Sequence, residues 1–160
     1  MSSIRKNIGF LIICMSLIWS SMALAVERTE FNFVDQGLVY EKIRQELVQN
    51  ELKVMKDGIE NLSMGIYEID LNSDSINEVI SLPGRTDKCD ASRLCLMILY
   101  ARNGDEVKRL GTFRAHDIHI SDKKTQGIRD LFVFENVRNN FRYEVYSYNA
   151  VTGQYEQKDN

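Results

Sequence analysis

One short stretch, DLNSDSINEV, carries oxygen-bearing side chains at a regular spacing. Hard cations such as calcium bind six or more oxygen atoms, and a tight loop supplies them from alternate positions. Five groups stand at loop positions 1, 3, 5, 7 and 9: the side chains of Asp70, Asn72 and Asp74, the backbone carbonyl of Ile76, and the side chain of Glu78. The spacing predicts a calcium site completed by water. The alternative, which the residues leave open, is a polar turn between two strands, held by Asx turns.

No catalytic motif accompanies this loop in the sequence. Nucleophilic catalysis usually shows a local signature such as G-x-S-x-G, which is absent, and no pair of carboxylates is singled out for glycosidase chemistry. His116 and His119, with Cys89 and Cys95, are the residue types of a zinc site. Histidines three apart on a strand point to opposite faces, however, so zinc is disfavoured. We therefore predict a protein that is not an enzyme.

The first 25 residues predict export. Arg5 and Lys6 form a basic start, an apolar run follows, and the segment ends in Ala23-Leu24-Ala25, which is typical of a cleavable signal peptide. This predicts a periplasmic or secreted protein. An uncleaved inner-membrane anchor is the alternative, and a lipoprotein signal at Cys14 is disfavoured because bulky Ile13 precedes the cysteine.

Cleavage after residue 25 would leave two cysteines, Cys89 and Cys95. An even pair in an oxidising compartment favours a disulfide across the short loop KCDASRLC. The whole chain has a formal net charge of −3, and the part after the signal carries about −5. Its basic residues are scattered, which argues against a nucleic-acid partner, since phosphate binding needs a clustered basic face.

Apolar periodicity predicts the elements that position these residues. Val39, Ile43 and Leu47 recur at helical spacing within residues 35–56, and after Gly58 the chain reads as short strands separated by turns. The predicted strands are 64–71, 78–82, 94–101, 106–113, 116–121, 131–135 and 141–148. The predicted fold class is α+β: an N-terminal amphipathic helix packed on one curved antiparallel sheet of about six to seven short strands. The predicted divisions are a signal at 1–25, a linker at 26–34, a single domain at 35–156 and a disordered tail at 157–160.

The acidic stretch has an echo later in the chain. DLNSDSINEVI from Asp70 and DKKTQGIRDLF from Asp122 share an acid, seven intervening residues, a second acid and two apolar residues. This similarity indicates a degenerate repeat, with chance as the alternative. Lys124 and Gln126 replace Asn72 and Asp74, so the second copy lacks the oxygen ligands.

Flanked by two predicted strands, DLNSDSINEVI resembles the calcium loop of FG-GAP and VCBS-type repeats, in which D-x-[DN]-x-D-G-x-x-[DE] precedes apolar residues. With the close cysteine pair and the segment GIRDL, it also resembles small bacterial periplasmic proteins of unassigned function. The resemblance implies calcium ligands at Asp70, Asn72, Asp74 and Glu78. The chain departs from the pattern at Ser73 and Ser75, where glycine is frequent or expected. The family suggests a β-propeller, but closure needs four or more blades, so a single sheet is expected here.

The end of the chain, FRYEVYSYNAVTGQY, predicts a partner surface. Alternation places Phe141, Tyr143 and Val145 on a core face, and Arg142, Tyr146 and Tyr148 on an exposed face suited to binding another protein. We expect a non-enzymatic exported envelope protein that binds another protein, as an accessory subunit of an envelope or secretion assembly. Two alternatives stay open: an inhibitor or immunity protein that blocks an enzyme with the protruding loop 83–93, and a calcium-dependent adhesion or stability module.

Overall fold

The computed structural model describes residues 26–34, 37–50, 64–83, 89, 94–137 and 140–158, which form two antiparallel sheets and one helix. Sheet A contains, in spatial order, β1 (Val26–Arg28), β7 (Asp117–Thr125), β8 (Ile128–Val137), β9 (Asn140–Asn149) and β10 (Gln154–Gln157). Sheet B contains β2 (Asn32–Val34), β3 (Met64–Ile69), β4 (Glu78–Pro83), β5 (Cys95–Asn103) and β6 (Glu106–Ala115). The helix α1 spans Leu38–Asn50.

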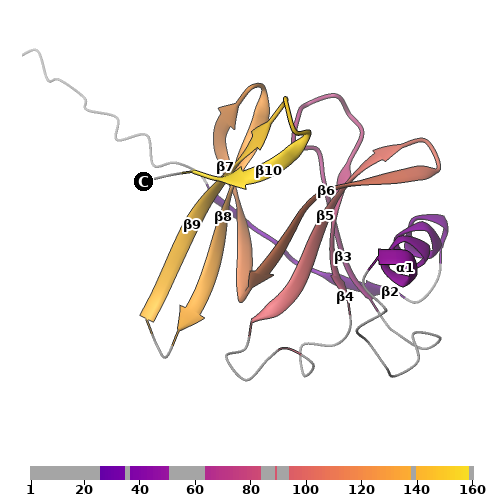
Figure 1. The fold of residues 1–160 in the computed structure, drawn as a ribbon, viewed down its shortest axis with the longest axis horizontal. Helices are drawn as coiled ribbons and strands as arrows, with labels where there is room; N and C mark the ends of the chain where they lie inside the picture. The colour runs from indigo at the N-terminus through magenta and orange to yellow at the C-terminus, as the bar shows by residue number, and fades with distance from the viewer. Residues whose placement is uncertain are drawn as a thin grey trace, which may run out of the picture.

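These elements form three layers, with sheet B between sheet A and α1 (Figure 1). β5 shows why the layers form. Its residues Met97 and Leu99 pack in the core between the two sheets, whereas Ile98 and Tyr100 pack in a second cluster with α1. Successive side chains of a strand point to opposite faces, so a strand that is apolar on both faces must be covered on both.

The predicted fold class is wrong. The described strands form two five-stranded sheets and the chain is mainly β, instead of one curved sheet of six or seven strands in an α+β fold. The larger core lies between the sheets and draws on β3 to β8 and β10. Alternation along a strand shows that its faces differ, but it does not show which strands share a sheet. That choice depends on contacts between residues far apart in the chain.

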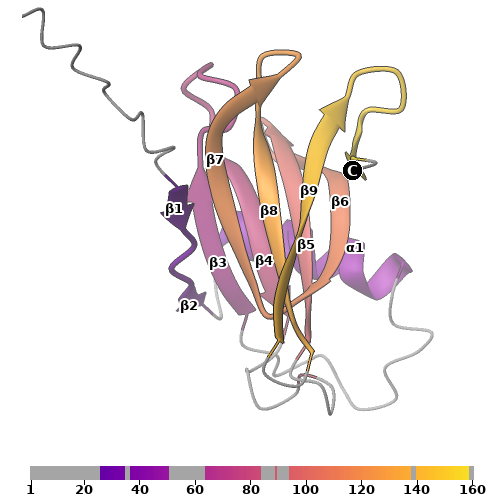
Figure 2. The same cartoon turned by 90° about the vertical axis from the view of Figure 1, so that its left-hand side faces the viewer.

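The ends of the predicted domain also differ from expectation. Residues 26–34, expected as a linker, contain two short edge strands, β1 in sheet A and β2 in sheet B. Figure 2 shows them at one side of the molecule, where the chain passes from one sheet to the other. In the predicted tail, Gln157 belongs to β10, and the Lys158 N–H donates to the Val145 carbonyl at 2.8 Å. The predicted signal at 1–25 lies outside the described residues.

The two sheets repeat one topology. Each has a short strand from residues 26–34 at one edge, followed by four strands in chain order. The two acidic segments identified in the sequence lie at equivalent hairpins, β3–β4 and β7–β8. Glu78 and Asp130, the second acids of the two copies, are both buried. The topology therefore supports interpreting the sequence echo as a structural repeat.

Candidate functional site

The acidic loop connects β3 to β4 and is closed by its own carboxylates. Asp70 accepts backbone N–H hydrogen bonds from Ser73 at 2.6 Å, from Asp74 at 3.3 Å and from Ser75 at 2.9 Å. These donors hold the pKa of the Asp70 carboxyl below its ordinary value, against the opposing effect of desolvation. Asp70 therefore organises the loop as an Asx-type turn.

The other predicted ligands lie around the same loop. Asp74 Oδ1 accepts from the Ile76 N–H at 2.7 Å, and Asp74 Oδ2 accepts from Asn72 Nδ2 at 2.8 Å. Ser73 and Ser75 have φ values of 69° and 68°, in the left-handed region that favours glycine. They occupy the two positions at which the resembled calcium loop carries glycine. Both serines thus have a backbone conformation that glycine adopts more easily.

Glu78 lies beneath the loop at the start of β4. Its Oε2 accepts the Leu71 N–H at 2.8 Å, and the residue is only 6% exposed. Burial raises the pKa of the Glu78 carboxyl, and the negative charges of Asp74 and Asp70 raise it further, against the effect of the Leu71 hydrogen bond. The loop thus places a buried acid with a raised pKa beside the half-buried Asp70 and the exposed Asp74.

This raised pKa predicts a pH effect on stability. The folded-state pKa of Glu78 lies above its ordinary value of 4.5. Between the ordinary and the raised pKa, the folded protein therefore binds more protons than the unfolded chain. The contribution of Glu78 to stability is therefore present at low pH and is lost as pH rises through the raised pKa. Glu78→Gln keeps an acceptor for the Leu71 N–H and removes this loss. Urea unfolding across this pH range is expected to show a smaller decline in stability for Glu78→Gln than for the unchanged protein.

The matched control is Glu106→Gln, which changes an exposed glutamate at the β5–β6 turn. We expect Glu106→Gln to leave the pH profile of stability unchanged. Identical profiles for both variants would contradict the assignment to Glu78.

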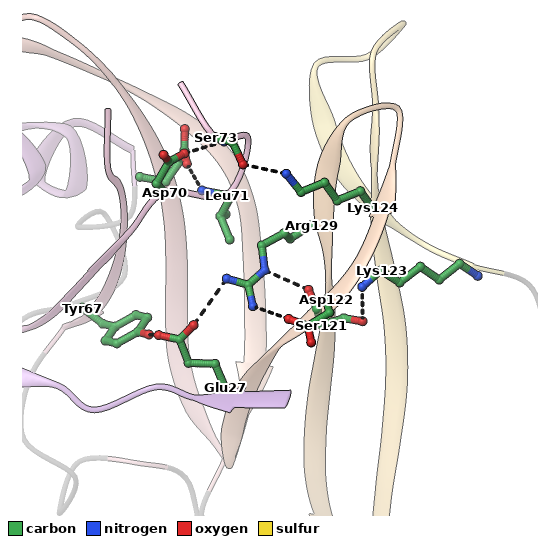
Figure 3. Close-up of polar contacts among 11 residues, drawn as sticks. Glu27, Tyr67, Asp70, Leu71, Ser73, Ser121, Asp122, Lys123, Lys124 and Arg129 are labelled. Atoms are coloured by element: carbon green, nitrogen blue, oxygen red, sulfur yellow. Dashed lines mark hydrogen bonds and ion pairs between the residues drawn. The ribbon is translucent and has the colours of Figure 1, made fainter. Parts of the chain in front are cut away.

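Arg129, which belongs to none of the predicted sites, connects the acidic loop to sheet A. Its backbone N–H donates to the Leu71 carbonyl at 2.9 Å, and its Nε donates to the Ser121 carbonyl at 2.9 Å. Its two terminal nitrogens reach Glu27 at 3.3 Å and Asp122 at 3.2 Å (Figure 3). The only sequence signal was its place in the second copy of the acidic pattern.

Further contacts surround Arg129. Tyr67 of β3 donates its hydroxyl to Glu27 of β1, so this pair also joins the two sheets. Lys124 Nζ donates to Ser73 Oγ at 2.6 Å, which fixes the acidic loop to the β7–β8 hairpin (Figure 3). The predicted calcium loop is therefore also part of the contact between the sheets.

The cysteines and histidines do not form a zinc site. Cys89 and Cys95 are joined by the predicted disulfide. His116 is exposed at the β6–β7 turn, whereas His119 lies on β7 with its Nε2 at 3.2 Å from Asp117 Oδ2. Within the described residues, no three His, Cys, Asp or Glu side chains are grouped so as to hold a metal ion. Most of the predicted inhibitory loop 83–93 lies outside the described residues.

Of the three predicted partner residues, only Arg142 is exposed as expected. Tyr146 and Tyr148 pack against the core between the sheets, where Tyr146 makes an edge-on contact with Phe113 at 5.1 Å. Tyr143, expected in the core, is 56% exposed, and Arg142 is exposed near the start of β9. The alternation was predicted correctly, but the inward set was assigned wrongly, because the pattern itself does not distinguish the two faces.

The outward side of sheet A carries a connected group of rings. Phe134 contacts His119 and Tyr143 at centroid distances of 4.5 Å and 5.6 Å, and Phe132 contacts Tyr143 at 5.3 Å. Val145 lies directly opposite Phe132 on the neighbouring strand. We call these five residues the aromatic face: His119, Phe132, Phe134, Tyr143 and Val145. In Figure 2 the strands that carry it, β7, β8 and β9, lie toward the viewer, in front of sheet B.

The two outer surfaces of the molecule differ in their covering. On sheet B, Tyr40, Ile43 and Leu47 of α1 pack against the outward side chains of β3, β4 and β5. On the described part of the chain, no helix or strand lies over the aromatic face of sheet A. Aromatic side chains on an uncovered sheet surface are typical of a protein-binding site.

No protein-family model matches this chain, and neither a curated protein nor a solved structure is significantly similar to it. Among the described residues, no helix is long and apolar enough to cross a membrane.

Proposed function

We propose that this is a non-enzymatic exported protein of the bacterial envelope that works by binding another protein through its aromatic face. The observation that carries the proposal is the group of rings on sheet A over which no described helix or strand lies, whereas α1 covers the opposite surface of the molecule. Export is inferred from the signal-like start of the chain, and the Cys89–Cys95 disulfide suits an oxidising compartment.

The composition of the aromatic face suits protein binding. Phenylalanine and tyrosine are enriched in the buried centres of interfaces, because they bury a large area with few rotatable bonds. Charged groups lie at the edge of this face: Arg28 Nε is 2.8 Å from Asp117 Oδ2, and the Arg28 side chain is 71% exposed. A ring-rich centre beside an ion pair is the usual arrangement of an interface core and its rim.

Site-specific photocrosslinking in the producing cells tests the proposal. A photoreactive amino acid at position 143 samples the most exposed part of the aromatic face, and one at Val151, which is 93% exposed on the β9–β10 turn, is the matched control. We expect a discrete protein adduct from position 143 and none from position 151. Equal or absent adducts at the two positions would reject the aromatic face as the binding surface.

A second candidate function is calcium-dependent stabilisation through the acidic loop. The left-handed backbone of Ser73 and Ser75 supports it, since these are the two positions at which the resembled pattern carries glycine. Asp70, Asn72, Asp74, Glu78 and the Ile76 carbonyl would be the oxygen ligands, and they would have to close around the ion, because the described Asp and Glu side chains are not grouped as a metal site in this structure. Millimolar calcium is then expected to raise the melting temperature by several degrees relative to a chelator.

Asp74→Ala is the variant that tests the metal site. It removes one proposed ligand on the exposed part of the loop and is expected to abolish the calcium-induced rise in melting temperature. Asp105→Ala, at the exposed β5–β6 turn, should retain that rise. An unchanged melting temperature in the starting protein would assign the loop a structural role only.

A further inference from the structure

The two sheets are equivalent residue by residue over three strands. Tyr67 lies opposite Ile80 in sheet B, and 52 positions later His119 lies opposite Phe132 in sheet A. The next strand keeps the correspondence, because Ile80 lies opposite Leu99 just as Phe132 lies opposite Val145. The register therefore shows which position in sheet A corresponds to which position in sheet B.

This correspondence shows what the aromatic face is equivalent to. Ile80 and Leu99 are fully buried in the core between the sheets, whereas their equivalents Phe132 and Val145 point outward from sheet A. Leu82, also buried in that core, corresponds to Phe134. The side of sheet B that packs against sheet A is thus equivalent to the aromatic face of sheet A.

The opposite sides of the two sheets are also equivalent, and both are covered. Leu131 of sheet A packs in the core against sheet B, and its equivalent in sheet B is Val79. Val79 is fully buried in the cluster formed with α1. The helix therefore covers the side on which a preceding sheet would pack, which is how a terminal element ends a row of repeats.

We infer that the aromatic face packs against the aromatic face of a second copy of this chain. This inference rests on the proposed function, since it names the occupant of the same surface. A second copy cannot continue the row in the same direction, because α1 covers the side on which the next sheet would pack. The remaining arrangement is face to face around a two-fold axis, which closes at a dimer with an α1 at each end.

The charge on this surface is compatible with such a pair. The Arg28 guanidinium and the Asp117 carboxylate at its edge lie 2.8 Å apart, and His119 also faces that carboxylate. Two copies would therefore bring together rings and balanced ion pairs, instead of like charges that repel. Tyr143, the most exposed ring of the group, would be buried within the contact.

Sedimentation equilibrium of the purified protein up to about 100 µM tests the dimer. We expect a concentration-dependent dimer, and we expect Tyr143→Glu to raise its dissociation constant at least about tenfold, because a charge would be buried without a partner. Val151→Glu introduces the same charge on the exposed turn and should leave dimerisation unchanged. Tyr143→Phe keeps the ring and should also keep the dimer.

A monomer at the highest concentration would overturn the inference, as would a Val151→Glu variant that dissociates as strongly as Tyr143→Glu. Open-ended polymers would also overturn it, because the α1 covering predicts closure at two copies. Equal melting temperatures at low concentration would show that Tyr143→Glu still folds. If the purified protein is a monomer but position 143 crosslinks to a different protein in cells, the proposed function stands and the second-copy inference fails.

Discussion

Replacing Arg129 with alanine is expected to lower the free energy of unfolding by about 2 to 4 kcal/mol. The Arg129 side chain is only 16% exposed and joins three groups: the Ser121 carbonyl and the carboxylates of Glu27 and Asp122. The change would leave the Ser121 carbonyl without this donor and two acids close together without the intervening cation. It would also remove the aliphatic stem at the contact between the acidic loop and sheet A. Urea unfolding followed by circular dichroism measures the loss.

The control for Arg129 is Arg28→Ala. Arg28 pairs with Asp117 at 2.8 Å, but its side chain is 71% exposed, so water replaces the lost contact. Exposed ion pairs contribute less than about 1 kcal/mol, and a change of that size is expected. An Arg129→Ala variant no less stable than Arg28→Ala would show that the acidic loop and sheet A do not depend on this side chain.

Replacing Glu46 with alanine is expected to cost about 2 to 4 kcal/mol and to loosen α1 from sheet B. Glu46 accepts a hydrogen bond from the Tyr100 hydroxyl at 2.7 Å and pairs with Arg109 of β6 through two contacts of 2.9 Å. Tyr100 is fully buried, so the loss leaves its hydroxyl without this acceptor. Arg109 also loses its carboxylate partner in a half-buried position. Thermal and urea unfolding would measure the cost.

The same helix provides the control. Glu41 pairs with Arg44 at 2.8 Å, three residues along α1, and both side chains are more exposed than those of the Glu46–Arg109 pair. Glu41→Ala is expected to cost only a few tenths of a kcal/mol. If Glu46→Ala cost no more, the hydrogen-bond network would not be what attaches α1. A Glu46→Ala, Arg109→Ala double-mutant cycle would isolate their coupling.

Loosening α1 also has a consequence for assembly. The helix covers Val79 and Ile98 on the outer side of sheet B. That side is equivalent to the side on which sheet A packs against sheet B. With α1 displaced, a second copy would gain a place to stack in the same direction. Glu46→Ala is therefore expected to form larger oligomers at high concentration, whereas Glu41→Ala is not.

Local signals in the sequence were sufficient for much of the secondary structure. Alternating apolar residues located β3 to β9 approximately, and the spacing of Val39, Ile43 and Leu47 located α1. The Asn103-Gly104 pair, a dipeptide typical of tight hairpins, lies where β5 and β6 meet, with Gly104 at φ 60°. β1 and β2 were missed because three residues are too few for a pattern, and their pairing with β7 and β3 is long-range.

The residues of the candidate site also differ in whether the sequence could identify them. The acidic loop could be identified from its spacing, since a turn is a local structure whose hydrogen bonds join residues within five positions. Arg129 could not be identified, because its partner Glu27 is 102 positions away. The aromatic face was assigned to the wrong side of β9 because the sequence shows alternation only.

By itself, the sequence determined where the chain alternates, where it turns, which cysteines pair and where its acidic loop stands. These properties depend on neighbours along the chain, so residue type and spacing are sufficient to predict them. Only the tertiary structure decided that the strands divide into two sheets, that Arg129 joins the acidic loop to sheet A, and that the rings of β8 and β9 face outward. Those outcomes depend on which distant surfaces exclude water together, and packing between sheets selects them after the local pattern has allowed more than one arrangement.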